Sequence, residues 1–193
     1  FNAEATRSGA DVTSYDILYR FSRTDIAARI QAVCDIVMNQ MAQNTDRYLW
    51  TRIRNLAELK ALRMAAMEEF LHDYELGKTD GRYVEHALPD PVALPDHSYG
   101  LGLSSHFLLL YENLGYEFHV AAIAEMLRLC REVRIFPICN LNGEATALAR
   151  DIAGHFARTH TVALVATDYR FQKSTHEMMV IAAAGECRPG VTD

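Results

Sequence analysis

The sequence predicts an α/β protein with a doubly wound, mostly parallel sheet and a terminal antiparallel strand. Short segments rich in β-branched and aromatic residues alternate with amphipathic helical patterns, as expected when helices connect parallel strands. The last two apolar segments, 161–167 and 177–183, have no helical pattern between them, so we expect them to pair antiparallel. Half of the 193 residues are hydrophobic and 23% are charged, which suits a single globular domain over residues 1–193.

The N-terminal part is expected to hold one short strand followed by two long helices. Residues 11–17 form the strand, because they combine β-branched and aromatic side chains. Apolar residues then recur every three or four positions over 24–43 and again over 56–76. One crossover helix is enough to connect two parallel strands. We therefore interpret residues 20–60 as a helical insertion or lid.

The remaining strands and helices follow in regular alternation. A proline-rich loop at 89–95 separates the second strand from the third. Helices are expected at 118–129 and 145–158. Strands are expected at 82–87, 99–104, 132–138, 161–167 and 177–183, and all but the last should run parallel to the strand at 11–17.

Composition narrows the range of partners and compartments. The formal net charge is −6, which argues against nucleic acid as a partner, because such binding depends on many Lys and Arg side chains. No apolar run reaches the roughly 18 residues that a membrane helix needs, and no signal peptide is visible. Four cysteines without CxxC spacing are interpreted as free thiols in a reducing, cytoplasmic compartment.

Two acidic residues follow predicted strands, where open α/β sheets bind their ligands. Asp16 ends the strand at 11–17, and a carboxylate there can accept hydrogen bonds from both hydroxyls of a ribose. Asp90 follows the next strand in the segment Leu88-Pro89-Asp90, where its carboxylate can accept an adenine amino proton. The alternative interpretations are a solvated loop carboxylate for Asp16 and a proline-stiffened loop for Asp90.

A hydroxyl and an imidazole follow the third predicted strand. The run from Gly102 to His106 differs from the G-x-S-x-G nucleophile elbow at its last position, where a tight turn favours glycine over histidine. We therefore expect Ser104, Ser105 and His106 to line a polar ligand site instead. A purely structural loop histidine is the alternative.

The insertion carries aromatic and basic residues between its two helices. Arg47, Tyr48, Trp50, Arg52 and Arg54 could stack against and clamp an anionic or aromatic ligand. The alternative is an aromatic pair that packs the helices, surrounded by solvated arginines. The histidines lack H-x₃-H spacing, so no metal site is expected.

Several stretches resemble class I S-adenosylmethionine-dependent methyltransferases, in particular a bacterial group of unassigned substrate. An acid, Asp16, ends the strand after Val12-Thr13-Ser14-Tyr15, as in that family. The segment 90–100 resembles the family's loop before the fourth strand, but it has Gly100 where the family usually has Asp. The stretches "SHFLLLY", "REVRIFPICNLNGE" and "YRFQKSTHEMM" carry the narrower resemblance.

The resemblance implies a Rossmann-like methyltransferase fold whose first strand and glycine-rich loop are missing from the given sequence. Phe1 to Ala5 would then form the helix after that loop. The implied cofactor is S-adenosylmethionine, and the implied cofactor-binding residues are Asp16, Ile17, Leu88, Asp90, Ser104 and Ser105.

The resemblance also implies an enzyme that methylates an acceptor. Its catalytic residues would be His106 and Tyr111. Independently of the resemblance, the length of the helical insertion leads us to expect that it covers the cleft or pairs with a second subunit, with Tyr48 or Trp50 facing the acceptor. The alternative is that the insertion packs only on the outer face of the sheet. The amide and base methylation signature Asp-Pro-Pro-Tyr does not occur, so a small molecule is the expected acceptor. A homodimer is a further expectation. The alternative is a non-catalytic protein with the same fold that binds a nucleoside or a partner. A third hypothesis is a nicotinamide dehydrogenase, in which a terminal antiparallel pair of strands is less expected.

Overall fold

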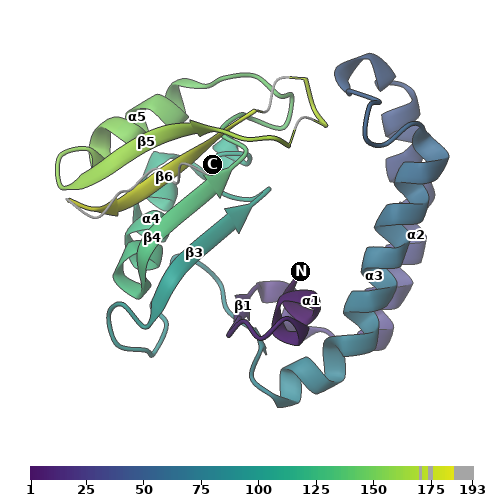
Figure 1. The fold of residues 1–193 in the computed structure, drawn as a ribbon, viewed down its shortest axis with the longest axis horizontal. Helices are drawn as coiled ribbons and strands as arrows, with labels where there is room; N and C mark the ends of the chain where they lie inside the picture. Colours follow the sequence, from purple (N-terminus) through teal and green to yellow (C-terminus); the bar gives the residue numbers. More distant parts are fainter. Residues whose placement is uncertain (170, 174–175, 185–193) are drawn as a thin grey trace. The chain divides into compact units, whose positions relative to one another are not determined.

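The chain forms two compact units, residues 1–87 and 88–193, which are described separately. The structure is a computed structural model, shown as a ribbon in Figure 1. It describes all residues except 170, 174–175 and 185–193.

The first unit is a two-helix hairpin beside a very small parallel sheet (Figure 1). Ser22 begins the first long helix with a reciprocal capping box to Asp25, and the Asn55 side chain caps the second by accepting a hydrogen bond from the Glu58 N–H. The elements in chain order are α1 (Asn2–Arg7), β1 (Ser14–Tyr15), η1 (Ile17–Arg20), α2 (Arg23–Ala42), η2 (Thr45–Arg47), α3 (Leu56–Thr79) and β2 (Tyr83–Val84).

Aromatic side chains form the core of this unit. Tyr74 is fully buried, and its hydroxyl donates one proton that is shared between the carbonyls of Phe21 at 2.9 Å and Tyr19 at 3.2 Å. The helix α3 continues past the expected end at residue 76 and includes Gly77. A side chain at Gly77 would overlap the ring of Tyr83, so glycine lets β2 return closely onto the helix.

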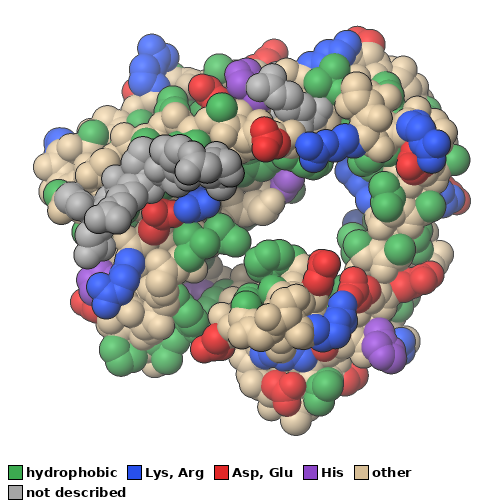
Figure 2. All heavy atoms as spheres, viewed as in Figure 1, with side chains coloured by type: hydrophobic (Ala, Val, Ile, Leu, Met, Phe, Trp, Pro, Cys, Tyr) green, Lys and Arg blue, Asp and Glu red, His purple; other side chains and the backbone are tan. Residues whose placement is uncertain are grey.

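Much apolar surface of the hairpin stays uncovered within its own unit. Ile36, Leu62 and Leu76 are 58%, 52% and 61% exposed. Figure 2 shows hydrophobic side chains scattered among charged ones over α2 and α3. Two helices alone cannot enclose the apolar residues that they carry.

The second unit is a four-stranded mixed sheet with two helices packed on it (Figure 1). The strand order is β3-β4-β6-β5; β3 and β4 pair parallel, whereas β6 pairs antiparallel with both of its neighbours. The elements are β3 (Tyr99–Ser105), η3 (Glu112–Leu114), α4 (Tyr116–Leu129), β4 (Cys130–Phe136), α5 (Ala147–Phe156), β5 (His160–Ala166) and β6 (Glu177–Ala183).

Both helices of this unit contribute to one core. Ile123 of α4 and Ile152 of α5 lie fully buried in the same cluster as Val133, Ile135 and Ile181 of the sheet. Alternate residues of β3 and β4, such as Leu103 and Arg134, point to the opposite face.

The predicted doubly wound, mostly parallel sheet is wrong. The strands form two separate sheets, and in the larger one the β4–β6 and β6–β5 ladders are antiparallel while β3–β4 is parallel. The helices α4 and α5 share one core on one face, so the sheet is not wound on both sides. Hydrophobic periodicity gives the positions of strands along the chain, but the neighbours of a strand depend on long-range contacts that periodicity does not encode.

Parts of the expected architecture are confirmed. The strand at 177–183 is antiparallel to its neighbours, and the strand predicted at 99–104 pairs parallel with the one predicted at 132–138. The strands predicted at 11–17 and 82–87 do pair parallel, but each retains only two paired residues. No helix in the described part of the chain is both long and apolar enough to cross a membrane.

The expectation of free thiols can be checked for three cysteines. Cys130 and Cys139 are buried and Cys34 is half-buried, and all three are free. Cys187 lies outside the described residues.

Candidate functional site

Asp16 lies where the parallel pair β1–β2 ends. Its backbone N–H donates to the Val84 carbonyl at 3.2 Å, and its Oδ1 accepts a hydrogen bond from the Leu18 N–H at 2.8 Å. Among the described residues, no group donates to Oδ2. The next two side chains, Ile17 and Leu18, are 51% and 39% exposed. An exposed carboxylate oxygen therefore lies beside exposed apolar side chains, which is the combination that a sugar hydroxyl and a planar base require.

A strained turn follows β3 and carries the serines and the histidine. His106 has φ +57° and Leu109 has φ +69°, both in the left-handed region that non-glycine residues rarely adopt. The Ser104 hydroxyl accepts a hydrogen bond from the Leu108 N–H at 3.3 Å and is nearly buried. The Ser105 hydroxyl lies 2.8 Å from His106 Nδ1. This pair is exposed, so the turn presents a hydroxyl and an imidazole to solvent.

The neighbouring parallel strand fixes the position of His106. Its N–H donates to the Phe136 carbonyl at 2.7 Å, and its ring meets the Phe136 ring edge-on at 5.7 Å. Phe136 in turn contacts Tyr169 edge-on, with the ring centroids 5.7 Å apart. The imidazole therefore lies at the carboxyl ends of β3 and β4, in contact with the ring of Phe136.

His119, to which the sequence assigned no role, contacts the backbone of this turn. It is fully buried on α4, and its Nε2 donates to the Tyr111 carbonyl at 3.2 Å. The Leu109 N–H points to its Nδ1 at 3.5 Å. Burial lowers the pKa of His119, so the neutral imidazole is favoured. The signal in the sequence was its spacing from Ala122 and Ile123, which places it on the core-facing stripe of α4.

An arginine that the sequence analysis did not single out holds the proline-rich loop. The Arg128 guanidinium on α4 donates to the carbonyls of Val92 and Leu94, both at 2.8 Å, and to the Glu125 carboxylate at 2.7 Å. Glu125 also accepts the Val92 N–H at 2.8 Å. Hydrogen bonds to Glu125 raise the pKa of Arg128, which stays charged. The loop is thus fastened to the helix that leads into β4.

The two residues predicted at the start of this loop differ in their surroundings. Leu88 is half-buried and packs against the main core of the second unit. Asp90 is exposed two residues later, after the cis peptide bond between Leu88 and Pro89. Leu88 therefore contributes to packing, while Asp90 is accessible to a ligand.

Tyr48 and Trp50 lie at the far end of the hairpin from Asp16. Their rings meet edge-on at 6.0 Å, and Trp50 Nε1 donates to the Thr45 carbonyl at 2.9 Å. Asp16 precedes the first turn of α2 and Tyr48 follows its last turn. Since an α-helix rises about 1.5 Å per residue, the 20 residues of α2 span about 30 Å. The structure therefore does not bring Tyr48 and Trp50, which were expected to face the methyl acceptor, close to Asp16, which was expected to bind the ribose.

The other predicted site residues fall into two groups. Ser104, Ser105 and His106 share one turn with Tyr111, whose side chain is 40% exposed. Asp16 and Ile17 belong to the first unit, so their convergence with this turn stays a prediction. Within the described residues, no three His, Cys, Asp or Glu side chains gather to hold a metal ion.

Comparison with known proteins identifies a family. The chain is 30% identical over 183 residues to "Uncharacterized protein MJ0045" of Methanocaldococcus jannaschii, a match that covers 94% of this chain and 80% of that protein. This chain belongs to the same family as that archaeal protein. No protein-family model matches the chain, and no solved structure matches it.

Proposed function

We propose that this protein binds S-adenosylmethionine and transfers its methyl group to a small-molecule acceptor. The observation that carries the proposal is the environment of Asp16. Its carboxylate ends a strand of a parallel pair, keeps one oxygen without a donor among the described residues, and adjoins the exposed side chain of Ile17. Parallel strands bind ligands at their carboxyl ends, and a ribose needs an oxygen acceptor of this kind.

The residues of the first unit fit the nucleoside part of the cofactor. Asp16 would hold the ribose hydroxyls, and Ile17 would pack against the adenine. Losing hydrogen bonds to a charged group costs about 1.5–3 kcal/mol, so one carboxylate can account for a large share of the binding energy.

The turn after β3 carries the side chains that would take part in methyl transfer. When bound, S-adenosylmethionine supplies an electrophilic methyl group. His106 would accept the proton of the acceptor, and the Ser105 hydroxyl on Nδ1 orients its ring. Tyr111 would hold the acceptor through its hydroxyl, and Ser104, Ser105 and Asp90 would bind polar groups of the cofactor.

Calorimetric titration of the full-length protein with S-adenosylmethionine and S-adenosylhomocysteine tests the proposal. Asp16→Asn retains a side chain that can cap η1 but loses the charge, and we expect it to weaken binding about 10- to 100-fold. The matched control is Asp11→Asn, which removes an exposed carboxylate that precedes β1 instead of following it. Equal affinity of Asp16→Asn and wild type for both ligands would overturn the role of Asp16.

Transfer of a labelled methyl group separates an enzyme from a non-catalytic nucleoside-binding protein. In a screen of small-molecule acceptors, His106→Asn and Tyr111→Phe should lower the transfer rate while cofactor affinity stays unchanged. Tight cofactor binding without transfer to any acceptor would favour the non-catalytic alternative. Absence of cofactor binding to the wild-type full-length protein would reject both.

A further inference from the structure

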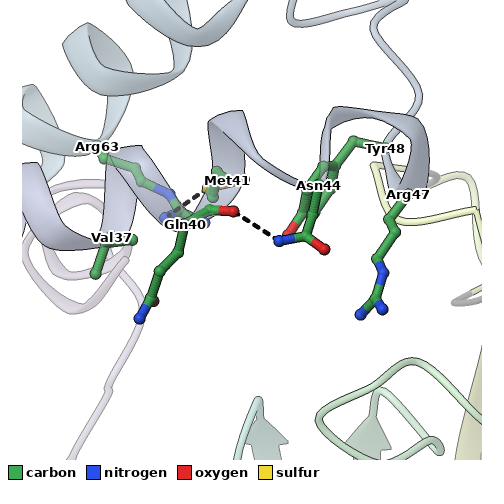
Figure 3. Close-up of a pocket in the computed structure, with 7 residues that line it drawn as sticks. All are labelled: Val37, Gln40, Met41, Asn44, Arg47, Tyr48 and Arg63. Atoms are coloured by element: carbon green, nitrogen blue, oxygen red, sulfur yellow. Dashed lines mark hydrogen bonds between the residues drawn. The ribbon is translucent and has the colours of Figure 1, made fainter.

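A second candidate site lies at the tip of the α2–α3 hairpin. A cavity of about 260 Å³ opens where α2 ends and the turn to α3 begins. Figure 3 shows side chains from both helices and from the turn around it. Its lining includes Gln40, Met41, Asn44, Arg47, Tyr48 and Arg63.

The charge of this cavity is opposite to that of the chain. Two arginines, Arg47 and Arg63, line it, and no Asp or Glu among the described residues does. The whole chain has a formal net charge of −6. A positive cavity in an acidic protein attracts an anionic ligand specifically rather than through overall charge.

Neither arginine is neutralised within the described part of the chain. Nearby cations do have partners, since Arg54 pairs with Glu58 at 3.1 Å and Lys60 with Asp35 at 2.8 Å. No ion pair involves Arg47 or Arg63 among the described residues, and the contact recorded for Arg63 is to the sulfur of Met41 at 3.5 Å. Two cations without carboxylate partners therefore remain available to a ligand.

The other lining groups add polar and planar contacts. The Asn44 amide nitrogen donates to the Gln40 carbonyl at 2.8 Å, which holds its carboxamide across the end of α2 (Figure 3). Tyr48 is half-buried at the same edge and offers a ring face or edge. The cavity is smaller than the roughly 300–1,000 Å³ of drug-sized ligand sites, so it suits a compact molecule.

We propose that this cavity binds a small molecule that carries a phosphate monoester. Two guanidiniums on different elements match a dianion with several oxygens better than a carboxylate, which one arginine can satisfy. The site goes beyond the proposed methyl transfer, because α2 separates it from Asp16 by about 30 Å.

Phenyl phosphate is a suitable probe, because it joins a phosphate dianion to an aromatic ring. Calorimetric titration of the full chain at a fixed, near-physiological salt concentration should give saturable binding at one site. Benzoate should bind at least ten-fold more weakly, and phenol should not bind measurably. Arg47→Gln and Arg63→Gln should each weaken phenyl phosphate binding ten-fold or more, and Tyr48→Leu should remove its advantage over inorganic phosphate.

Arg52→Gln is the matched control, because Arg52 lies in the same turn but does not line the cavity. It should bind phenyl phosphate as wild type does, and thermal unfolding should show that all four variants remain folded. The proposal fails if wild type shows no saturable binding, or if Arg52→Gln loses as much affinity as the other two arginine variants. Equal displacement of the probe by a single-stranded RNA oligomer, with equal loss in all three arginine variants, would indicate a diffuse polyanion surface and would also overturn it.

Discussion

At the scale of single residues, the best-defined polar contact of the first unit joins α3 to β2. The Arg82 guanidinium donates two hydrogen bonds to the Asp73 carboxylate, at 2.7 and 2.9 Å, and the Tyr83 hydroxyl donates a third at 2.8 Å. The Arg82 and Asp73 side chains are 13% and 16% exposed. Hydrogen bonds from Arg82 lower the pKa of Asp73 below its ordinary value of 3.8. The folded state therefore favours the ionised carboxylate.

Asp73→Asn should destabilise the protein by about 2–4 kcal/mol at pH 7, because a largely buried guanidinium loses the carboxylate that accepts two of its hydrogen bonds. Since the folded-state pKa is lowered, the contribution of Asp73 is present above the unfolded pKa near 3.8 and is lost as pH falls through the folded value. Denaturant unfolding at pH 7 and pH 3 should show that the difference in free energy of unfolding between wild type and variant is smaller at pH 3.

The control is Asp80→Asn. The Asp80 carboxylate lies 3.6 Å from the same arginine and is 47% exposed, so the substitution should cost less than about 1 kcal/mol. Equal costs for both variants would contradict the argument.

Sequence reasoning at this scale located groups but not their partners. Asp16 and His106 could be proposed because each directly follows a strand-like run, where ligand groups concentrate. The roles of His119 and Arg128 depend on groups 8 to 36 residues away that face them after folding. No local pattern identifies such pairs, so these supporting residues could not be predicted.

At the scale of elements, position along the chain was largely predictable. The helix expected at 24–43 is Arg23–Ala42, and the strand expected at 177–183 is Glu177–Ala183. The helix has a long periodic apolar pattern and the strand is a continuous apolar run, and both signals stand out in the sequence. The strand at 11–17 shrank to Ser14–Tyr15, because a ladder needs a partner and β2 offers only two paired residues. A segment whose residues favour an extended backbone becomes a β-strand only where another strand pairs with it.

A close approach between β3 and the end of α4 gives an element-scale prediction. A Cβ atom built at Gly102 would lie 2.8 Å from Cys130 Sγ, whereas one at Gly100 would meet no atom within 4 Å. Gly102→Ala should therefore destabilise the second unit by about 1–3 kcal/mol through overpacking. Gly100→Ala on the same strand should be nearly neutral.

The cause of that cost can be isolated in a double-mutant cycle. Cys130→Ala removes the sulfur that the new methyl group would strike, so Gly102→Ala should cost less in that background than in wild type. Denaturant unfolding of the four proteins measures the coupling. Additive costs would show that the close approach to Cys130 is not the source of the destabilisation.

At the scale of the whole molecule, the two units differ in how much core each contains. Among the described residues, the main cluster of the second unit has 14 buried residues, whereas the aromatic cluster of the first unit has three. Every member of the larger cluster lies between Leu108 and Ile181. The second unit therefore has a continuous core made of its own residues, whereas the first unit has only a small one. Both units keep exposed apolar side chains, such as Leu103 and Leu164 in the second and Leu62 in the first.

This difference predicts the behaviour of the separate units. A fragment of residues 88–193 should unfold in one cooperative transition on heating, because burial of a continuous core drives cooperativity. A fragment of residues 1–87 should show helical circular dichroism but a broad, weakly cooperative transition, since most helix stability comes from tertiary packing. Thermal scans by circular dichroism, with 8-anilinonaphthalene-1-sulfonate fluorescence to report exposed apolar surface, measure both. Stronger dye binding is expected for the first fragment than for the second, because its core is much smaller. A sharp transition for residues 1–87 without dye binding would show that the hairpin is complete by itself, and a broad one for residues 88–193 would show that the larger core depends on the rest of the chain.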